Sequence, residues 1–156
     1  PRAWVSVDAK YRGETFRFFS THLEQDVMPF APIQEAQGNE VISLLASSPY
    51  PVIALGDYNT GDGAATATYG NLIASGLTDV WREVNFENSG FTTEGIGPDL
   101  LGAFTLSKRL DLIMYHGNMR GLQAWLVGDQ EGNRTPSGLM PSDHAGVVAR
   151  IRIGVR

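Results

Sequence analysis

Residues 52–59 read VIALGDYN, an apolar run that is followed by a glycine, an aspartate, a tyrosine and an asparagine. The run follows Pro51 and is typical of a strand that is buried on both faces of a sheet. Side chains two positions apart on an extended chain point the same way. Asp57 and Asn59 should therefore both face outward at the carboxyl edge of this strand, although an Asx-turn that ends the strand would give the same pattern.

The residues before this strand predict a β-hairpin and a helix. Residues 4–11 (WVSVDAKY) and 15–23 (TFRFFSTHL) are rich in β-forming residues, and the intervening RGE places a turn at Arg12-Gly13. Residues 32–47 (PIQEAQGNEVISLLAS) carry apolar side chains at helical spacing, which predicts an amphipathic helix. Gly38 lowers the intrinsic stability of this helix by about 1 kcal/mol relative to alanine.

The residues after the buried strand predict short elements that alternate with loops. Residues 68–76 predict a short helix that ends at Gly76. Residues 83–108 are rich in Gly, Asn and Thr and predict a long irregular loop, which in a compact domain is typically functional. Further strands are expected at 110–115, 122–127 and 146–153, and a second loop at 128–144.

This order of elements predicts one α+β domain over residues 1–156, a mostly antiparallel β-sheet with helices on one face. A helix layer covers only one face of a sheet, so the opposite apolar face needs a second layer. The sequence does not obviously supply that layer. It begins with Pro1, which is compatible with removal of an initiator methionine or with a chain that starts inside a longer protein.

Composition restricts the classes of function. The chain has 156 residues, of which 42% are hydrophobic, enough for one domain with a hydrophobic core. A formal net charge of -5 argues against tight binding to nucleic acid by charge alone, but it does not bear on small phosphates. The absence of cysteine excludes disulfides, thiolate zinc sites and cysteine nucleophiles. No apolar run is long enough for a membrane span.

Polar residues cluster at four predicted strand ends, and each cluster alone has an ordinary structural explanation. A histidine after a strand is more often a hydrogen-bonded structural residue than a catalytic one, and Asp111 beside Arg109 could form a surface ion pair worth under about 1 kcal/mol. The clusters are His22 in STHLE, Asp57 and Asn59 in GDYN, Asp111 in KRLDLI, and Asp143 with His144 in PSDHAGVV.

Taken together and in this order, STHLE, GDYN, RLD and SDHAGVV resemble the motifs of the endonuclease/exonuclease/phosphatase superfamily, which is also called DNase I-like. The resemblance runs from Trp4 to Ile153 and covers only the C-terminal half of the family domain. It implies half of a four-layer α/β/β/α sandwich. The family's N-terminal motifs, a strand that ends in Asn and a later strand with a metal-binding Glu, have no counterpart. The Gln34-Glu35 dipeptide lies on a predicted helix and is not equated with that ligand.

The resemblance also implies roles for the clustered residues. Asp57 would orient or deprotonate the attacking water, and Asn59 would donate its amide hydrogens to the phosphate. His144 would contact the phosphate while Asp111 accepts a hydrogen bond from its other ring nitrogen. His22 would be a second phosphate donor or an acid on the leaving-group side.

The metal and the substrate class follow from the same resemblance. Asp143 would bind Mg²⁺ or Mn²⁺ through oxygen, as hard cations prefer. The implied activity is that of a metal-dependent phosphoesterase, a phosphodiesterase or nuclease-like hydrolase. Nucleic acid is the default substrate, and the acidic charge also admits a phospholipid or a small diester. Arg134, Thr135 and Ser137 could touch substrate, although a solvated loop is the more ordinary interpretation.

The missing half suggests two ways to cover the open sheet face. Two copies could pack sheet on sheet as a homodimer, or an N-terminal half could complete the domain. Without the N-terminal Glu the chain alone should be weakly active or inactive. The alternative function is a noncatalytic half-domain that acts as a dimerisation or partner-binding module. The final motif looks most like bacterial members, which are often exported, but the cellular location is otherwise undetermined.

Overall fold

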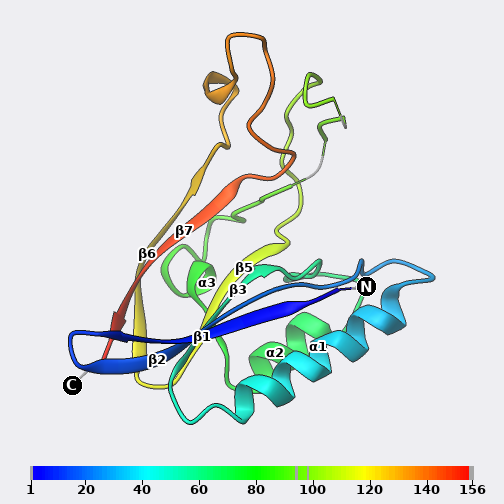
Figure 1. Ribbon diagram of the computed structural model, residues 1–156. Helices are drawn as coiled ribbons and strands as arrows, with labels where there is room; N and C mark the ends of the chain where they lie inside the picture. The colour runs from blue at the N-terminus through cyan, green and yellow to red at the C-terminus, as the bar shows by residue number, and fades with distance from the viewer. Residues whose placement is uncertain (1, 94, 98, 155–156) are drawn as a thin grey trace.

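The computed structural model describes residues 2–93, 95–97 and 99–154, so Pro1 lies outside the described part, and it shows a mixed α+β chain (Figure 1). No helix in the described part is both long and apolar enough to cross a membrane. The elements in chain order are β1 (Trp4–Tyr11), β2 (Glu14–His22), α1 (Ala31–Ala46), β3 (Val52–Asp57), α2 (Thr68–Ala74), β4 (Thr78–Asp79), α3 (Val80–Val84), β5 (Asp111–His116), β6 (Met119–Val127), the short 3₁₀ helix η1 (Glu131–Asn133) and β7 (Gly146–Ile153).

The described strands form a five-stranded sheet and a separate two-stranded ribbon. The order of the larger sheet is β1-β2-β3-β5-β4, and β6 pairs with β7. Only β2 and β3 pair in parallel, so the predicted, mostly antiparallel α+β class is confirmed. The sequence predicted one sheet and the structure has two, because β7 meets β5 through side chains and not through a hydrogen-bonded ladder. Ile151 and Ile153 of β7 pack in one apolar cluster with Tyr115 of β5.

Most predicted elements appear where the sequence placed them. The hairpin turns at Arg12-Gly13, where both residues have positive φ, and α1 occupies the predicted helical stretch. The sequence missed β4 and α3, which are too short to show a hydrophobic period. The helix α3 is stabilised locally, because the carboxylate of Asp79 accepts hydrogen bonds from the backbone N–H of Trp81 and of Arg82.

Helices α1 and α2 cover one face of the larger sheet, while α3 packs against β6 (Figure 1). A Cβ atom on Gly38 of α1 would lie 2.4 Å from the Cγ2 atom of Thr68 on α2. The glycine that weakens the isolated helix is therefore required for the close approach of the two helices. The core under these helices takes alternate residues of the central strands, Val52, Ala54, Leu112 and Met114, with Val41, Leu45 and Leu72 from the helices.

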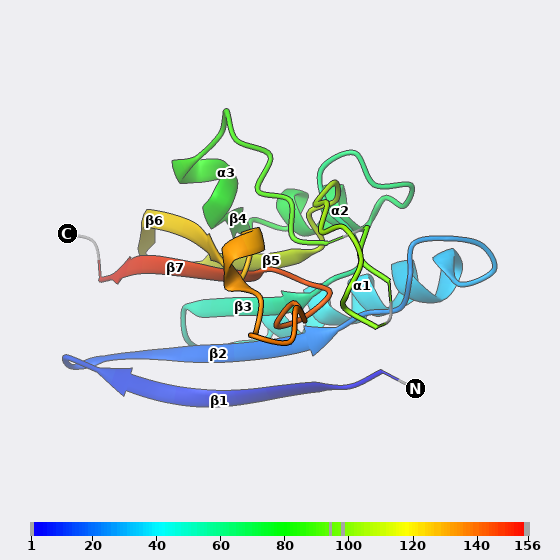
Figure 2. The same ribbon diagram turned by 90° about the horizontal axis from the view of Figure 1, so that it is seen from above.

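The opposite face of the larger sheet is covered at one end and open at the other. The β6–β7 ribbon and α3 pack over β3 and β5, where they bury Ile53 and Tyr115. At the β1–β2 end, which Figure 2 shows at the edge of the sheet, large apolar side chains of this face are exposed. The exposed fraction is 55% for Val7 and 38% for its cross-strand partner Phe18, and Val5 and Tyr11 are exposed beside them. We call this group, Val5, Val7, Tyr11 and Phe18, the open apolar face.

Candidate active site

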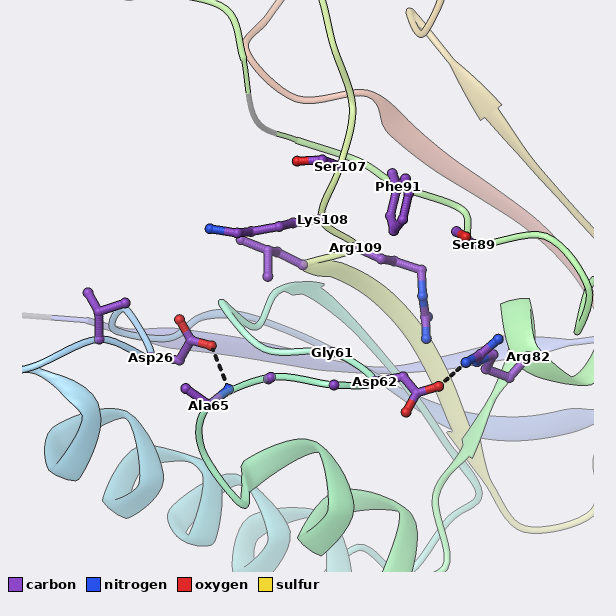
Figure 3. Close-up of a pocket in the computed structure, with 14 residues that line it drawn as sticks. Asp26, Gly61, Asp62, Ala65, Arg82, Ser89, Phe91, Ser107, Lys108 and Arg109 are labelled. Carbon is purple, nitrogen blue, oxygen red and sulfur yellow. Dashed lines mark hydrogen bonds and ion pairs between the residues drawn. The ribbon is translucent and has the colours of Figure 1, made fainter.

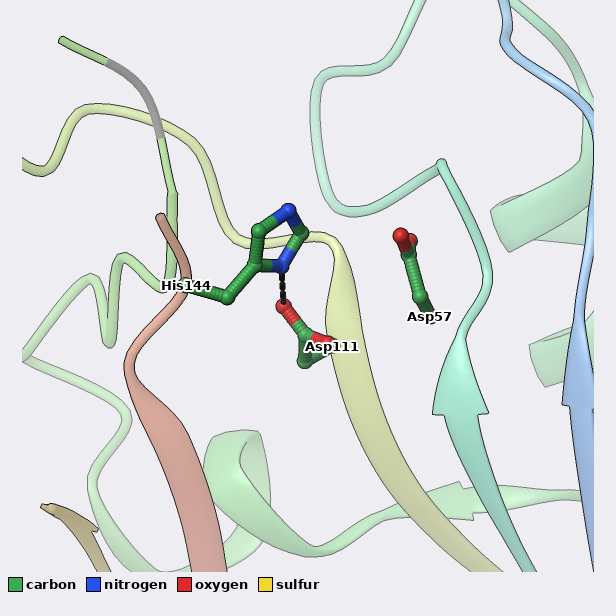
Figure 4. A group of neighbouring side chains, drawn as sticks. All are labelled: Asp57, Asp111 and His144. Carbon is green, nitrogen blue, oxygen red and sulfur yellow. Dashed lines mark hydrogen bonds and ion pairs between the residues drawn. The ribbon is translucent and has the colours of Figure 1, made fainter. Parts of the chain in front are cut away.

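Three predicted site residues converge at one end of the larger sheet (Figure 4). Asp57 ends β3 and lies opposite Asp111, the first residue of β5, in the antiparallel register. His144 precedes β7 and forms an isolated bridge with Thr93. One oxygen or nitrogen atom from each of Asp57, Asp111 and His144 lies within 4.8 Å of the other two. The fold thus brings together side chains that are 33 to 87 positions apart in the sequence.

The imidazole of His144 is oriented by Asp111. Its Nδ1 atom lies 2.7 Å from Oδ2 of Asp111, and its other ring nitrogen points away from that carboxylate (Figure 4). This hydrogen bond is the main reason that the pKa of His144 is raised above its ordinary value; burial opposes the shift, while charges on Asp111, Asp57 and Asp143 support it. The pair can therefore present an imidazole N–H to a phosphate oxygen.

The carboxylate of Asp57 lies between the two histidines of the site. Burial raises its pKa and the negative charge of Asp111 adds to the rise, whereas a hydrogen bond from the backbone N–H of Asn59 opposes it. That hydrogen bond closes an Asx-turn, and Asn59 has a φ of 47°, which asparagine tolerates better than most residues. The turn interpretation and the site interpretation of GDYN therefore describe the same geometry.

His22 and Asn59 lie on the other side of Asp57. Arg2, which the sequence analysis did not single out, lies beside His22. The Nε2 atom of His22 is 3.3 Å from Oδ2 of Asp57 and 3.2 Å from Nδ2 of Asn59. The Nη1 atom of Arg2 lies 2.7 Å from the same Nε2 atom. A single arginine near the start of a sequence carries no motif signal, so only the fold reveals its place at the site.

A cation could bind at this edge of the sheet. Within the described residues, Asp57, Asp111 and His144 form the group of potential metal ligands, and two of the three are oxygen donors that suit Mg²⁺ or Mn²⁺. Asp143, the predicted metal ligand, does not belong to this group. Its side chain is exposed and accepts a hydrogen bond from Ser142, while its backbone carbonyl accepts one from Thr93. Its role as a ligand therefore stays a prediction.

Thr92, which sequence reasoning also missed, ties the Asp111 and His144 segments together. It is fully buried, and its Oγ1 atom accepts hydrogen bonds from the backbone N–H of Leu110 and of Asp111. Its carbonyl accepts a hydrogen bond from the N–H of Ala145, next to His144. A hydroxyl that acts on the backbone leaves no charge or motif in the sequence, so nothing there identifies it.

Two cationic residues near the site have structural roles. The interpretation of Arg109 and Asp111 as a surface ion pair is wrong, because Arg109 is buried and pairs with Asp79 at 2.6 Å. Asp111 instead forms its hydrogen bond with His144. Arg134, considered as a substrate contact, instead donates to the carbonyls of Leu100, Gly102 and Gly138. It thereby joins the two long loops that extend beyond the same end of the sheet in Figure 1.

A cavity of about 390 Å³ lies next to the clustered side chains (Figure 3). Its wall includes Gly61, two residues after Asn59, and Leu110, which immediately precedes Asp111. The wall carries two acidic residues, Asp26 and Asp62, and three basic ones, Arg82, Lys108 and Arg109. Arg82 is ion-paired with Asp62, and Arg109 with Asp79. Phe91, Ser89 and Ser107 also line it.

The Asp111–His144 hydrogen bond predicts a measurable pKa change. Asp111→Asn should lower the pKa of His144, because the largest cause of its rise is lost, whereas Asp8→Asn in the β1–β2 pair should leave it unchanged. NMR titration of the His144 ring in the presence of a chelator measures this. The raised pKa stabilises the fold fully below the ordinary value of about 6.5, and this contribution disappears as the pH rises through the folded value. An unshifted His144 in Asp111→Asn would contradict the geometry.

No family model and no curated protein matches the sequence. Solved structures do match. The chain is similar to D. rerio TDP2 complexed with single strand DNA product, with 19% identity and a TM-score of 0.74 over 97% of this chain and 62% of that one. It is also similar to truncated Caenorhabditis elegans TDP2, with 24% identity and a TM-score of 0.69 over 94% of this chain and 58% of that one.

A third similar structure is an endonuclease/exonuclease/phosphatase family protein from Leptotrichia buccalis C-1013-b. It has 22% identity and a TM-score of 0.69 over 96% of this chain and 54% of that one. The chain thus spans little more than half the length of these proteins. Between 94% and 97% of this chain is covered in these comparisons, so it shares the fold of these solved structures, one of which is an endonuclease/exonuclease/phosphatase family protein.

Proposed function

We propose that this chain carries the catalytic edge of a metal-dependent phosphodiesterase. The observation that supports this most directly is the convergence of Asp57, Asp111 and His144, with ligand atoms within 4.8 Å of one another, on a fold shared with TDP2 and with endonuclease/exonuclease/phosphatase proteins. Hydrolysis of a phosphate ester requires an oriented water, donors for the phosphoryl oxygens and neutralisation of negative charge. The clustered side chains offer a group for each task.

In the proposed reaction, Asp57 orients the attacking water and accepts its proton. His144 donates a hydrogen bond from Nε2 to a phosphoryl oxygen, while Asp111 accepts from Nδ1 and stabilises the positive form of the ring. Asn59 would donate to the phosphate the amide hydrogen that faces His22 in the free protein, while its other amide hydrogen stays on the Leu23 carbonyl. Mg²⁺ or Mn²⁺ would be held by carboxylates of this edge, from Asp57, Asp111 or Asp143, and would supply positive charge for the phosphoryl group.

We propose that the alcohol part of the ester occupies the cavity beside the cluster. Two cations of its wall, Arg82 and Arg109, are already ion-paired with carboxylates, and the wall also has one aromatic ring and two serine hydroxyls. This combination suits an uncharged polar group better than a second phosphate. The D. rerio TDP2 structure holds a single strand DNA product, which supports testing nucleic acid first. The net charge of -5 makes a small diester or a phospholipid a reasonable second choice.

The test is an assay of the purified chain with single-stranded DNA, plasmid DNA, sphingomyelin and bis(p-nitrophenyl) phosphate, with Mg²⁺, Mn²⁺ or a chelator. We expect weak hydrolysis that the chelator abolishes, because the N-terminal Glu motif of the family has no counterpart in this sequence. Hydrolysis that persists in the chelator would contradict metal dependence. No hydrolysis of any ester would favour the noncatalytic alternative.

The open apolar face favours that alternative, a dimerisation module, and a second copy of this chain is the occupant that we propose for it. Val5, Val7, Tyr11 and Phe18 are exposed on one face of the edge pair β1–β2, and monomeric proteins rarely leave large apolar patches uncovered. An isologous contact that is centred on this face and includes the residues around it should bury more than about 1,200 Å² in total.

Light scattering, which measures the molar mass in solution, tests this proposal. The chain should be a dimer at micromolar concentration, and Val7→Asp should make it monomeric because it places a carboxylate in the contact. Val27→Asp is the matched control, since Val27 has nearly the same exposed fraction, 52% against 55%, but lies in the loop before α1. A monomeric wild-type chain would reject the proposal.

A further inference from the structure

The guanidinium of Arg2 is fixed in place beside the proposed site. It donates to the Glu24 carboxylate from Nη2 at 2.8 Å and from Nε at 3.4 Å. Glu24 is in turn held by a 2.7 Å hydrogen bond from its backbone N–H to the side chain of Gln37 on α1. The remaining nitrogen, Nη1, faces the His22 ring at 2.7 Å. Helix α1 thus fixes the position of the Arg2 guanidinium through Gln37 and Glu24.

The contact between Arg2 and His22 determines where the imidazole carries its proton. A guanidinium can only donate hydrogen bonds and stays charged in proteins, so the Nε2 atom that faces it at 2.7 Å must accept. The amide nitrogen of Asn59, also a donor, faces the same atom at 3.2 Å. A neutral ring whose Nε2 accepts carries its proton on Nδ1.

One neighbour favours the opposite tautomer. Oδ2 of Asp57 lies 3.3 Å from Nε2 of His22 and could accept a hydrogen bond only if Nε2 carried the proton. Arg2 is closer to Nε2 than Asp57 is, and its charge strengthens the hydrogen bond that it donates. Without the guanidinium, Nε2 faces the Asp57 carboxylate at 3.3 Å and the neutral amide of Asn59, whose nitrogen already donates to the Leu23 carbonyl at the shorter distance of 2.9 Å. The charged acceptor should then favour a proton on Nε2.

We propose that Arg2 is a positioning residue that holds His22 as the Nδ1–H tautomer and itself supplies the positive charge beside Asp57. His22 then has no proton on Nε2 to give to a leaving group, in contrast to the acid role that the sequence resemblance implies. The consequence for catalysis rests on the proposed function, but the tautomer does not. Arg2 thereby supplies the positive charge that a protonated His22 would otherwise supply on this side of the site.

The experiment is long-range ¹H–¹⁵N NMR of the histidine rings at about pH 8, where an ordinary imidazole is neutral. The spectrum distinguishes the two tautomers without any assay, and His22→Asn assigns the signals. Wild type should show the Nδ1–H pattern for His22. Arg2→Met, which removes every donor, should shift His22 toward Nε2–H, whereas Arg2→Lys should keep Nδ1–H because the ammonium still donates.

Arg17→Met is the matched control, because it removes the same charge from an exposed pair with Asp8 and should leave the His22 pattern unchanged. An Nε2–H pattern in wild type, or an Nδ1–H pattern that persists in Arg2→Met, would overturn the proposal. If wild type hydrolyses no ester but the tautomer shifts as described, the proposed function fails while the positioning by Arg2 stands.

Discussion

Replacing Asp57 by asparagine is expected to lower kcat for bis(p-nitrophenyl) phosphate by about 10³-fold, within the range found for loss of a general base. Asparagine has the same shape, and its carbonyl oxygen can still accept the Asx-turn hydrogen bond from Asn59. It cannot accept a proton from water, and it removes a negative charge that faces His22 and His144. The loss should therefore appear in kcat, with KM much less affected.

The control for this prediction is Asp8→Asn, which removes the same charge from the exposed Arg17 pair on β1. That variant should retain the wild-type kcat. Initial rates at saturating Mg²⁺ compare the variants, and thermal unfolding shows that each is folded. A turnover of Asp57→Asn close to that of wild type would remove Asp57 from the proposed mechanism.

Asp79→Ala is expected to lower the free energy of unfolding by about 3–5 kcal/mol, the usual cost of leaving one partner of a buried ion pair alone. The carboxylate of Asp79 is 4% exposed and accepts from Arg109 at 2.6 Å, from the Tyr69 hydroxyl at 2.8 Å and from the N–H of Trp81 at 3.0 Å. Alanine would leave the guanidinium buried without its counter-charge and would also remove the cap of α3.

Urea denaturation measures this loss, with Asp8→Ala as the exposed comparison. Water screens the Asp8–Arg17 pair, so that variant should unfold close to wild type. Equal unfolding midpoints for Asp79→Ala and wild type would show that the buried pair contributes little. Asp79→Ala should also reduce activity, since Arg109 anchors the segment that enters β5 at Asp111.

The sequence predicts the central strands from local pattern, and the main cluster from the resemblance of the four motifs, taken together, to a known family. VIALGD forms β3 as its apolar run suggests, and the motifs at strand ends place Asp57, Asp111 and His144 at one edge. Arg2 and Thr92 could not be predicted, because their roles depend on which segments the fold brings beside them. The break between β5 and the β6–β7 ribbon has no local signal either, since it depends on side-chain packing between strands.

The residues of the site should differ in their resistance to local unfolding, because Asp57 and Asp111 lie on the paired strands β3 and β5 and His144 does not. Asp57 lies on β3, which is paired with β2 on one side and with Asp111 of β5 on the other. Amide hydrogen exchange in these central strands should therefore require nearly global unfolding. His144 follows a long loop and is held to that framework mainly through Asp111 and Thr92. In dilute denaturant the imidazole should therefore detach first, and activity should fade before the sheet unfolds.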